Sequence, residues 1–150
     1  MLDGNLASYP KNATSPQEIM PYSPLIGTRN GVSPRFVLRY AGKRVKGEGV
    51  FPPLFTGPPD TAHGGMVAAL FDELLTAVVL RNGPAAFTAS LTGQYRQRIR
   101  IGEKVTLLAE ITQREGRKIH TYGELFQQGV LAATAEALFI EPRQPGEEKQ

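Results

Sequence analysis

Large apolar side chains recur at every second position in the segment around residues 36–40. Phe36, Leu38 and Tyr40 form one such series. A period of two places alternate side chains on the same face of an extended strand. We therefore expect two strands, at residues 35–41 and 44–51, joined by a tight turn.

A longer apolar segment follows, and it does not alternate. Residues 66–80 are hydrophobic at nearly every position, with Asp72, Glu73 and Thr76 as the polar exceptions. A helix that is apolar on all sides is a buried one. Asn-Gly-Pro at residues 82–84 carries the signals that end a helix. Because a membrane span needs roughly 20 apolar residues, the segment predicts a core helix instead.

Alternation returns in the second half of the chain. It predicts four strands, at residues 87–99, 104–115, 118–127 and 131–140, which short turns join into an antiparallel meander. One helix packed on one antiparallel sheet is an α+β arrangement. A strand of about eleven residues reaches roughly 36 Å, so such a sheet can wrap the helix.

The chain divides into one folded domain and two flanking segments. Residues 1–34 are expected to form an N-terminal arm with one short helix that begins at Pro16, a residue favoured at that position. Residues 35–141 form the folded domain. Residues 142–150 are polar, and we expect a disordered tail.

The composition limits which kinds of site and partner the chain can have. The chain has no cysteine and only two histidines, His63 and His120, which lie far apart in the sequence. Disulfides and thiolate metal sites are therefore excluded, and we expect no metal. The formal net charge of +3 is too small to indicate nucleic acid but suits an anionic partner. The N-terminus has no signal-peptide pattern, so we expect a cytoplasmic protein without a membrane partner.

Two carboxylates in the apolar helix are the most unusual feature of the sequence. Burying an ionised carboxylate is costly unless it is paired or used. Asp72 and Glu73 are adjacent, so they point about 100° apart and at most one faces a given site. An arginine partner is one explanation for either. We favour Asp72 as a catalytic carboxylate and, for Glu73, a structural role over a catalytic one.

Gly64 and Gly65 lie where the helix begins. The first N–H groups of a helix are unpaired and lie at the positive end of its dipole, so they can stabilise an oxyanion. Gly64 and Asp72 are eight residues apart, about 12 Å along the helix axis, which is too far for one reacting carbon. Both can act together only if Asp72 meets the Gly64 of a second subunit. The spacing therefore predicts a homodimer with two shared sites.

Arginines gather after the helix. Arg96, Arg98 and Arg100 recur at a period of two, which predicts that they share one strand face. A second basic group lies at residues 114–118. Arginine suits the recognition of phosphate, although a solvated sheet face is the alternative explanation.

Together these features resemble a known family. His63-Gly64-Gly65, with a carboxylate nine residues after the histidine, is similar to the hotdog thioesterases of the PaaI-like group in the 4-hydroxybenzoyl-CoA thioesterase superfamily. The likeness runs from about Gly47 to Glu141. It implies a hotdog fold, a long central helix wrapped by a curled antiparallel sheet of five to six strands. It also implies an enzyme that hydrolyses an acyl-CoA thioester to the free acid and coenzyme A.

The resemblance implies roles for single residues. Asp72 corresponds to the family's catalytic carboxylate, which acts as a general base or as a nucleophile. Gly64 corresponds to the oxyanion-hole glycine, and Gly65 joins it in binding substrate. Thr88 stands where relatives place a Ser or Thr that helps orient water. His63 corresponds to the motif histidine, in a structural role.

Gly57 departs from the family pattern, since relatives often carry an asparagine six residues before the histidine. This departure leaves a non-catalytic acyl-CoA binding protein as one alternative. A hydratase or dehydratase of acyl thioesters on the same fold is another, with His63 as its acid–base. The resemblance implies no cofactor apart from the coenzyme A of the substrate. It also implies a homodimer or a homotetramer built as a dimer of dimers.

Overall fold

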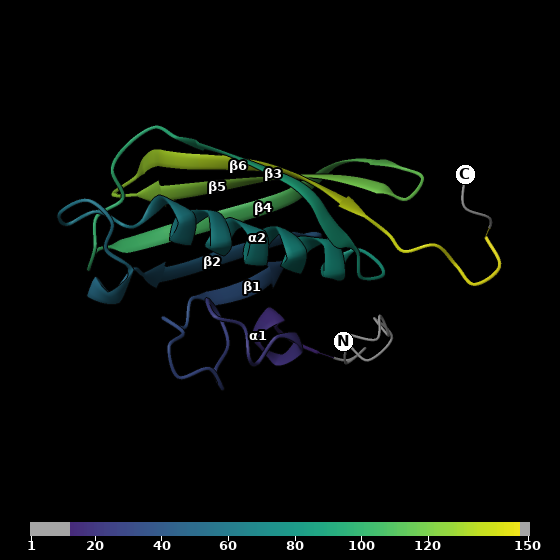
Figure 1. The fold of residues 1–150 in the computed structure, drawn as a ribbon, viewed down its shortest axis with the longest axis horizontal. Coiled ribbons are helices and arrows are strands. Elements are labelled where there is room, and N and C mark those ends of the chain that lie inside the picture. The colour runs from purple at the N-terminus through teal and green to yellow at the C-terminus, as the bar shows by residue number, and fades with distance from the viewer. Residues whose placement is uncertain (1–12, 148–150) are drawn as a thin grey trace.

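A computed structural model describes residues 13–147, in which a six-stranded sheet lies behind one long helix (Figure 1). The elements are α1 (Pro16–Ile19), β1 (Val37–Ala41), β2 (Arg44–Val50), the 3-10 helix η2 (Pro53–Phe55), α2 (Gly64–Arg81), β3 (Phe87–Tyr95), β4 (Lys104–Glu115), β5 (Lys118–Gln127) and β6 (Val130–Ile140). The predicted α+β hotdog class is confirmed. The ends of the expected arm and tail, residues 1–12 and 148–150, lie outside the described residues.

The proline-rich segment between β2 and α2 contains one helical turn, η2, that begins at Pro53. The amide of Phe55 donates to the carbonyl of Pro52 at 2.9 Å, and the amide of Thr56 donates to that of Pro53 at 3.2 Å. Proline fits the first positions of a helical turn because their N–H groups have no helical partner.

The strand order is β1-β2-β4-β5-β6-β3, and every neighbouring pair is antiparallel. The predicted meander is therefore right for β4, β5 and β6 but wrong for β3. Strand β2 takes the place beside β4, with Val45 opposite Ala109. Strand β3 instead pairs with β6 and forms the far edge of the sheet.

Strand β3 also ends earlier than the sequence pattern predicts. The amides of Arg96 and Gln97 both donate to the carbonyl of Ala132, at 2.8 and 3.1 Å. Two successive amides on one acceptor break the ladder, so the strand stops at Tyr95. The expectation that Arg96, Arg98 and Arg100 share one strand face is therefore wrong.

Helix α2 is buried against the inner face of the sheet, as predicted. Leu70, Phe71, Leu74 and Leu75 are at most 1% exposed. Gly123 on β5 allows the close approach of the helix, because a Cβ there would lie 3.1 and 3.2 Å from side-chain carbons of Phe71 and Leu75. Within residues 13–147, no helix has both the length and the apolar character to cross a bilayer.

Glu73 is the carboxylate of α2 that faces the N-terminal segment. Burial raises its pKa, a hydrogen bond with the Ser23 side chain lowers it, and neighbouring Asp72 raises it. Its Oε2 atom is buried and, within the described chain, has no hydrogen-bond partner. The Ser23 hydroxyl oxygen also accepts the amides of Leu25 and Ile26, both at 3.2 Å. Glu73 thus fastens the segment that precedes β1 to the central helix.

We predict that Glu73→Gln stabilises the protein at neutral pH. A raised pKa in the folded state means that folding keeps a proton on Glu73, so wild-type stability falls as pH rises from about 4.3, the ordinary value of a Glu carboxyl, through the folded pKa. Glutamine is isosteric and does not titrate. Thermal unfolding from pH 4 to 8 should show a higher Tm for the variant at pH 8, with the difference shrinking towards pH 4. A difference that grows on acidification contradicts the prediction; Glu115→Gln, at the exposed end of β4, is the matched control.

Candidate functional site

The first turn of α2 leaves one backbone donor free. His63 is the N-cap, and its Nδ1 accepts the Gly65 N–H at 3.0 Å. The amides of Met66 and Val67 donate to the His63 carbonyl at 3.0 and 3.1 Å. Within residues 13–147, no acceptor pairs with the Gly64 N–H. The His63 side chain thus caps the helix N-terminus through the Gly65 amide and leaves the Gly64 amide uncapped.

The loop before the helix is pinned to the segment that follows β3. The Ala62 amide donates to the Ile99 carbonyl at 2.8 Å. The Arg98 guanidinium donates to the Thr61 hydroxyl at 2.9 Å and to the Pro59 carbonyl at 3.1 Å. Arg98 therefore clamps the loop that leads into His63.

Gly57 packs directly against the N-cap residue. A Cβ at position 57 would lie 2.9 Å from the Cα of His63 and 3.4 Å from its Cβ. The first distance is shorter than real Cβ contacts, and its partner is backbone that cannot swing away. The loop of this chain thus has no room for an asparagine at position 57 unless the His63 backbone moves.

A hollow of about 420 Å³ opens beside the N-terminus of α2. Gly64, Val67 and Tyr95 line it, together with Arg96, Arg98 and other residues of the loop and of the segment after β3. The Tyr95 hydroxyl donates to the Gly64 carbonyl at 2.6 Å. Burial raises the pKa of Tyr95, so the phenol stays protonated and can donate at neutral pH.

Asp72 lies further along α2 and is hydrogen-bonded by β3. Its Oδ1 accepts the Thr88 hydroxyl at 2.8 Å. Among residues 13–147, no cation lies within ion-pair distance of Asp72, and no donor pairs with its Oδ2. The arginine partner considered from the sequence is therefore absent from the described chain.

A β-bulge explains how Thr88 reaches Asp72. Strict alternation places Thr88 on the same face as Ser90 and Thr92, which line a hollow on the outer face with Tyr122 of β5. The β3–β6 register shifts between Thr88 and Ser90. One extra residue turns the side chain before it to the other face. Thr88 consequently points at α2, although the pattern alone predicts the opposite.

The predicted site residues form two groups within one chain. His63, Gly64 and Gly65 lie at the helix N-terminus, and Asp72 lies with Thr88 eight residues later, about 12 Å along the axis. Sequence reasoning missed Tyr95, although its place in the alternating series of β3 already put it on the face that meets the helix.

The three arginines have separate environments. Arg96 and Arg98 line the hollow beside Gly64. Arg100 lies 3.9 Å from Glu103, and its amide donates to the Gln127 side chain at 2.8 Å. In the described part of the chain, no group of three or more His, Asp or Glu side chains could hold a metal ion.

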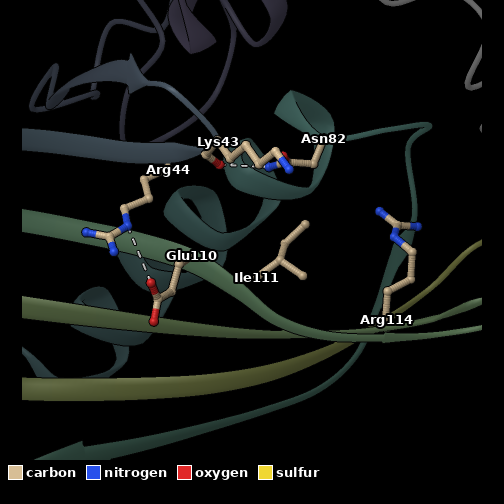
Figure 2. Close-up of a pocket in the computed structure, with 6 residues that line it drawn as sticks. All are labelled: Lys43, Arg44, Asn82, Glu110, Ile111 and Arg114. Atoms are coloured by element: carbon tan, nitrogen blue, oxygen red, sulfur yellow. Dashed lines mark hydrogen bonds and ion pairs between the residues drawn. The ribbon is translucent and has the colours of Figure 1, made fainter.

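A second hollow, of about 400 Å³, lies at the opposite end of α2 (Figure 2). The Asn82 side chain donates to the Lys43 carbonyl at 2.8 Å, and Arg44 lies 3.5 Å from Glu110. Cations at this place suit the negative end of the helix dipole. The hollow begins ten residues beyond Asp72, about 15 Å along the axis, so it lies apart from Asp72 and from the N-terminus of the helix, and its basic lining has a structural explanation.

Comparison with known proteins places these features in a family. The family model of the thioesterase superfamily matches residues 60–134, which is half of the chain. Acyl-coenzyme A thioesterase THEM4 of Xenopus laevis is 32% identical over 90 residues. That match covers 59% of this chain and 40% of the relative, so the chain corresponds to less than half of that protein.

Solved structures share the fold. A thioesterase superfamily protein, RHA08564, superposes with a TM-score of 0.75 at 31% identity, covering 78% of this chain and 62% of that one. The Escherichia coli PaaI protein of the phenylacetic acid degradation operon gives a TM-score of 0.67 at 14% identity, covering 71% of this chain and 82% of its own. With its central helix, its six-stranded sheet and the matched segment, the chain belongs to the thioesterase superfamily, and it shares its hotdog fold with the PaaI protein.

Proposed function

We propose that this protein hydrolyses an acyl-CoA thioester to the free acid and coenzyme A. The observation that carries the proposal is Asp72, a carboxylate on a mostly apolar helix that accepts a hydrogen bond from Thr88 but has no cation beside it within the described chain. A carboxylate kept in this state can act as a base or nucleophile. The name of the THEM4 relative supports the substrate class.

The proposed active unit is a homodimer. Strand β3 forms an unpaired edge of the sheet and is exposed at every residue except Leu91, with Phe87 at 55%. A long exposed edge strand is a template for pairing with a second chain. Ala68 and Ala69, midway between Gly64 and Asp72, are half-exposed small residues that let another helix approach. A two-fold axis near them brings each Asp72 to the other chain's Gly64.

The proposed reaction uses both groups on one carbonyl. The thioester oxygen accepts the Gly64 N–H of one protomer, at the positive end of α2. On the general-base route, Asp72 of the other protomer takes a proton from water as the water adds to the carbonyl carbon, and the C–S bond of the adduct then breaks. On the nucleophilic route, Asp72 attacks that carbon, the C–S bond breaks as the anhydride forms, and water then hydrolyses the anhydride. On either route the thiolate of coenzyme A leaves and takes up a proton. Thr88 holds Oδ1 and leaves Oδ2 to react.

The phosphates of coenzyme A need cationic contacts. We propose the three arginines for these contacts and rank them by whether another group of the chain already engages the side chain. Arg96 lies at the hollow beside Gly64, and no carboxylate within residues 13–147 pairs with it. Arg98 is engaged by the loop, and Arg100 by Glu103. Arg96 is therefore the first candidate. A dimer of dimers, implied by the family resemblance, stays a prediction.

We predict that Asp72→Asn lowers thioester hydrolysis by at least about 10²-fold, because general acid–base groups typically contribute 10²–10⁴-fold. The amide keeps the shape of the side chain and its hydrogen bond with Thr88. The measurement is release of free thiol from short, long and aromatic acyl-CoAs.

Glu110→Gln, at the distant second hollow, is the control and should keep its turnover. Unchanged turnover in Asp72→Asn contradicts the assignment of Asp72. Tight binding of acyl-CoA without any thiol release by the wild type favours the non-catalytic binding protein instead. Loss of the acyl-CoA with the thioester intact favours a hydratase or dehydratase.

A further inference from the structure

Tyr95 is the last residue of β3 and makes the shortest hydrogen bond in the site. Its hydroxyl donates to the Gly64 carbonyl at 2.6 Å, within the range of a good O–H···O bond. The bond joins the exposed edge of the sheet to the first residue of α2. None of the motifs read from the sequence includes this tyrosine.

The ring of Tyr95 also shapes the space beside Gly64. It lies back over its own strand, since a Cβ on Gly93 would be 3.6 Å from the ring carbon Cε2. A Cβ on Gly64 would meet only Tyr95, with the ring carbon Cζ and the hydroxyl oxygen both at 3.9 Å. The ring therefore forms a wall of the hollow directly beside Gly64.

Gly64 needs an external restraint. Glycine has the widest backbone freedom of any residue, and Gly64 is followed by a second glycine at a helix end, where helices fray. His63 Nδ1 restrains the Gly65 amide, not that of Gly64. An oxyanion donor must be held within about 0.5 Å and 10–20° of its productive geometry. The hydroxyl of Tyr95 is the side-chain contact that holds Gly64 in the described chain.

We propose that Tyr95 is a positioning residue for the oxyanion donor: its hydroxyl fixes the Gly64 backbone so that the Gly64 N–H points into the hollow. The inference rests on the proposed thioester hydrolysis and deepens it. Tyr95 acts through Gly64 and does not itself touch the reacting atoms.

The test compares Tyr95→Phe with Tyr122→Phe, a β5 tyrosine that lines the hollow on the outer face of the sheet. Tyr95→Phe removes the hydroxyl and keeps the ring wall. We expect its kcat to fall about ten-fold, less than the 10²–10³-fold loss on removing an oxyanion donor. KM should stay within about two-fold, because the substrate-facing ring remains. Tyr95→Ala, which also removes the wall, should raise KM as well.

A purely structural role for Tyr95 makes a different prediction. If the hydroxyl only stabilises the fold, Tyr95→Phe lowers the Tm and leaves the kcat of the folded enzyme unchanged. That result overturns the inference. An equal fall of kcat in Tyr122→Phe overturns it too.

A second readout separates this inference from the proposed function. The ¹⁵N–¹H resonance and the hydrogen-exchange rate of the Gly64 amide should change in Tyr95→Phe and stay as in the wild type in Tyr122→Phe. If the wild type releases no thiol from any acyl-CoA, the proposed function fails, and the Gly64 amide still tests the positioning. A Gly64 amide that is insensitive to Tyr95→Phe overturns the inference whatever the activity.

Discussion

The burial of helix α2 is the constraint that determines how the rest of the chain is arranged. Its apolar side chains extend around almost the whole helix, so the sheet must wrap it, and strands β2 to β6 all contact it. What the sheet leaves uncovered is the N-terminal turn at Gly64 and a half-exposed stripe that includes Ala68 and Asp72. Because polar groups are costly inside such a core, the uncovered parts are where chemistry can be placed. The two carboxylates illustrate the contrast: Glu73 is fastened to the N-terminal segment, whereas Asp72 stays open to one side.

Strand β3 assembles both halves of the candidate site from the edge of the sheet. Its bulge turns Thr88 towards Asp72, and its last residue, Tyr95, reaches Gly64. The same strand has a free edge, so a second chain that pairs there would lie beside both groups. Strand β3 therefore both positions side chains of the candidate site and provides the edge at which a second chain would pair. This link is why the 12 Å between Gly64 and Asp72 is an argument for a dimer rather than against a site.

Periodicity predicted the buried helix and nearly all strand limits, since core contacts enforce those patterns over many residues. It failed where one local hydrogen bond decides the geometry. The early end of β3 depends on two amides that share the Ala132 carbonyl, and the orientation of Thr88 depends on one extra residue. Spacing predicted the place of β3 along the chain but not beside β6, because strand order is set by long-range pairing. Asp72 and Gly64 were identifiable from the sequence as a charge on an apolar helix and as the start of that helix, whereas the contacts of Tyr95 and Arg98 follow only from the folded structure.

The central claim is that each site takes Asp72 from one chain and Gly64 from the other, and a heterodimer of two inactive variants tests it most directly. Asp72→Ala removes the carboxylate. Gly64→Pro removes the N–H, and proline is tolerated at the first helical position after the extended His63. With a different affinity tag on each chain, the purified heterodimer has one intact site and should show about half the wild-type turnover per dimer, while both homodimers stay inactive. A heterodimer that is as inactive as its parents contradicts the shared site.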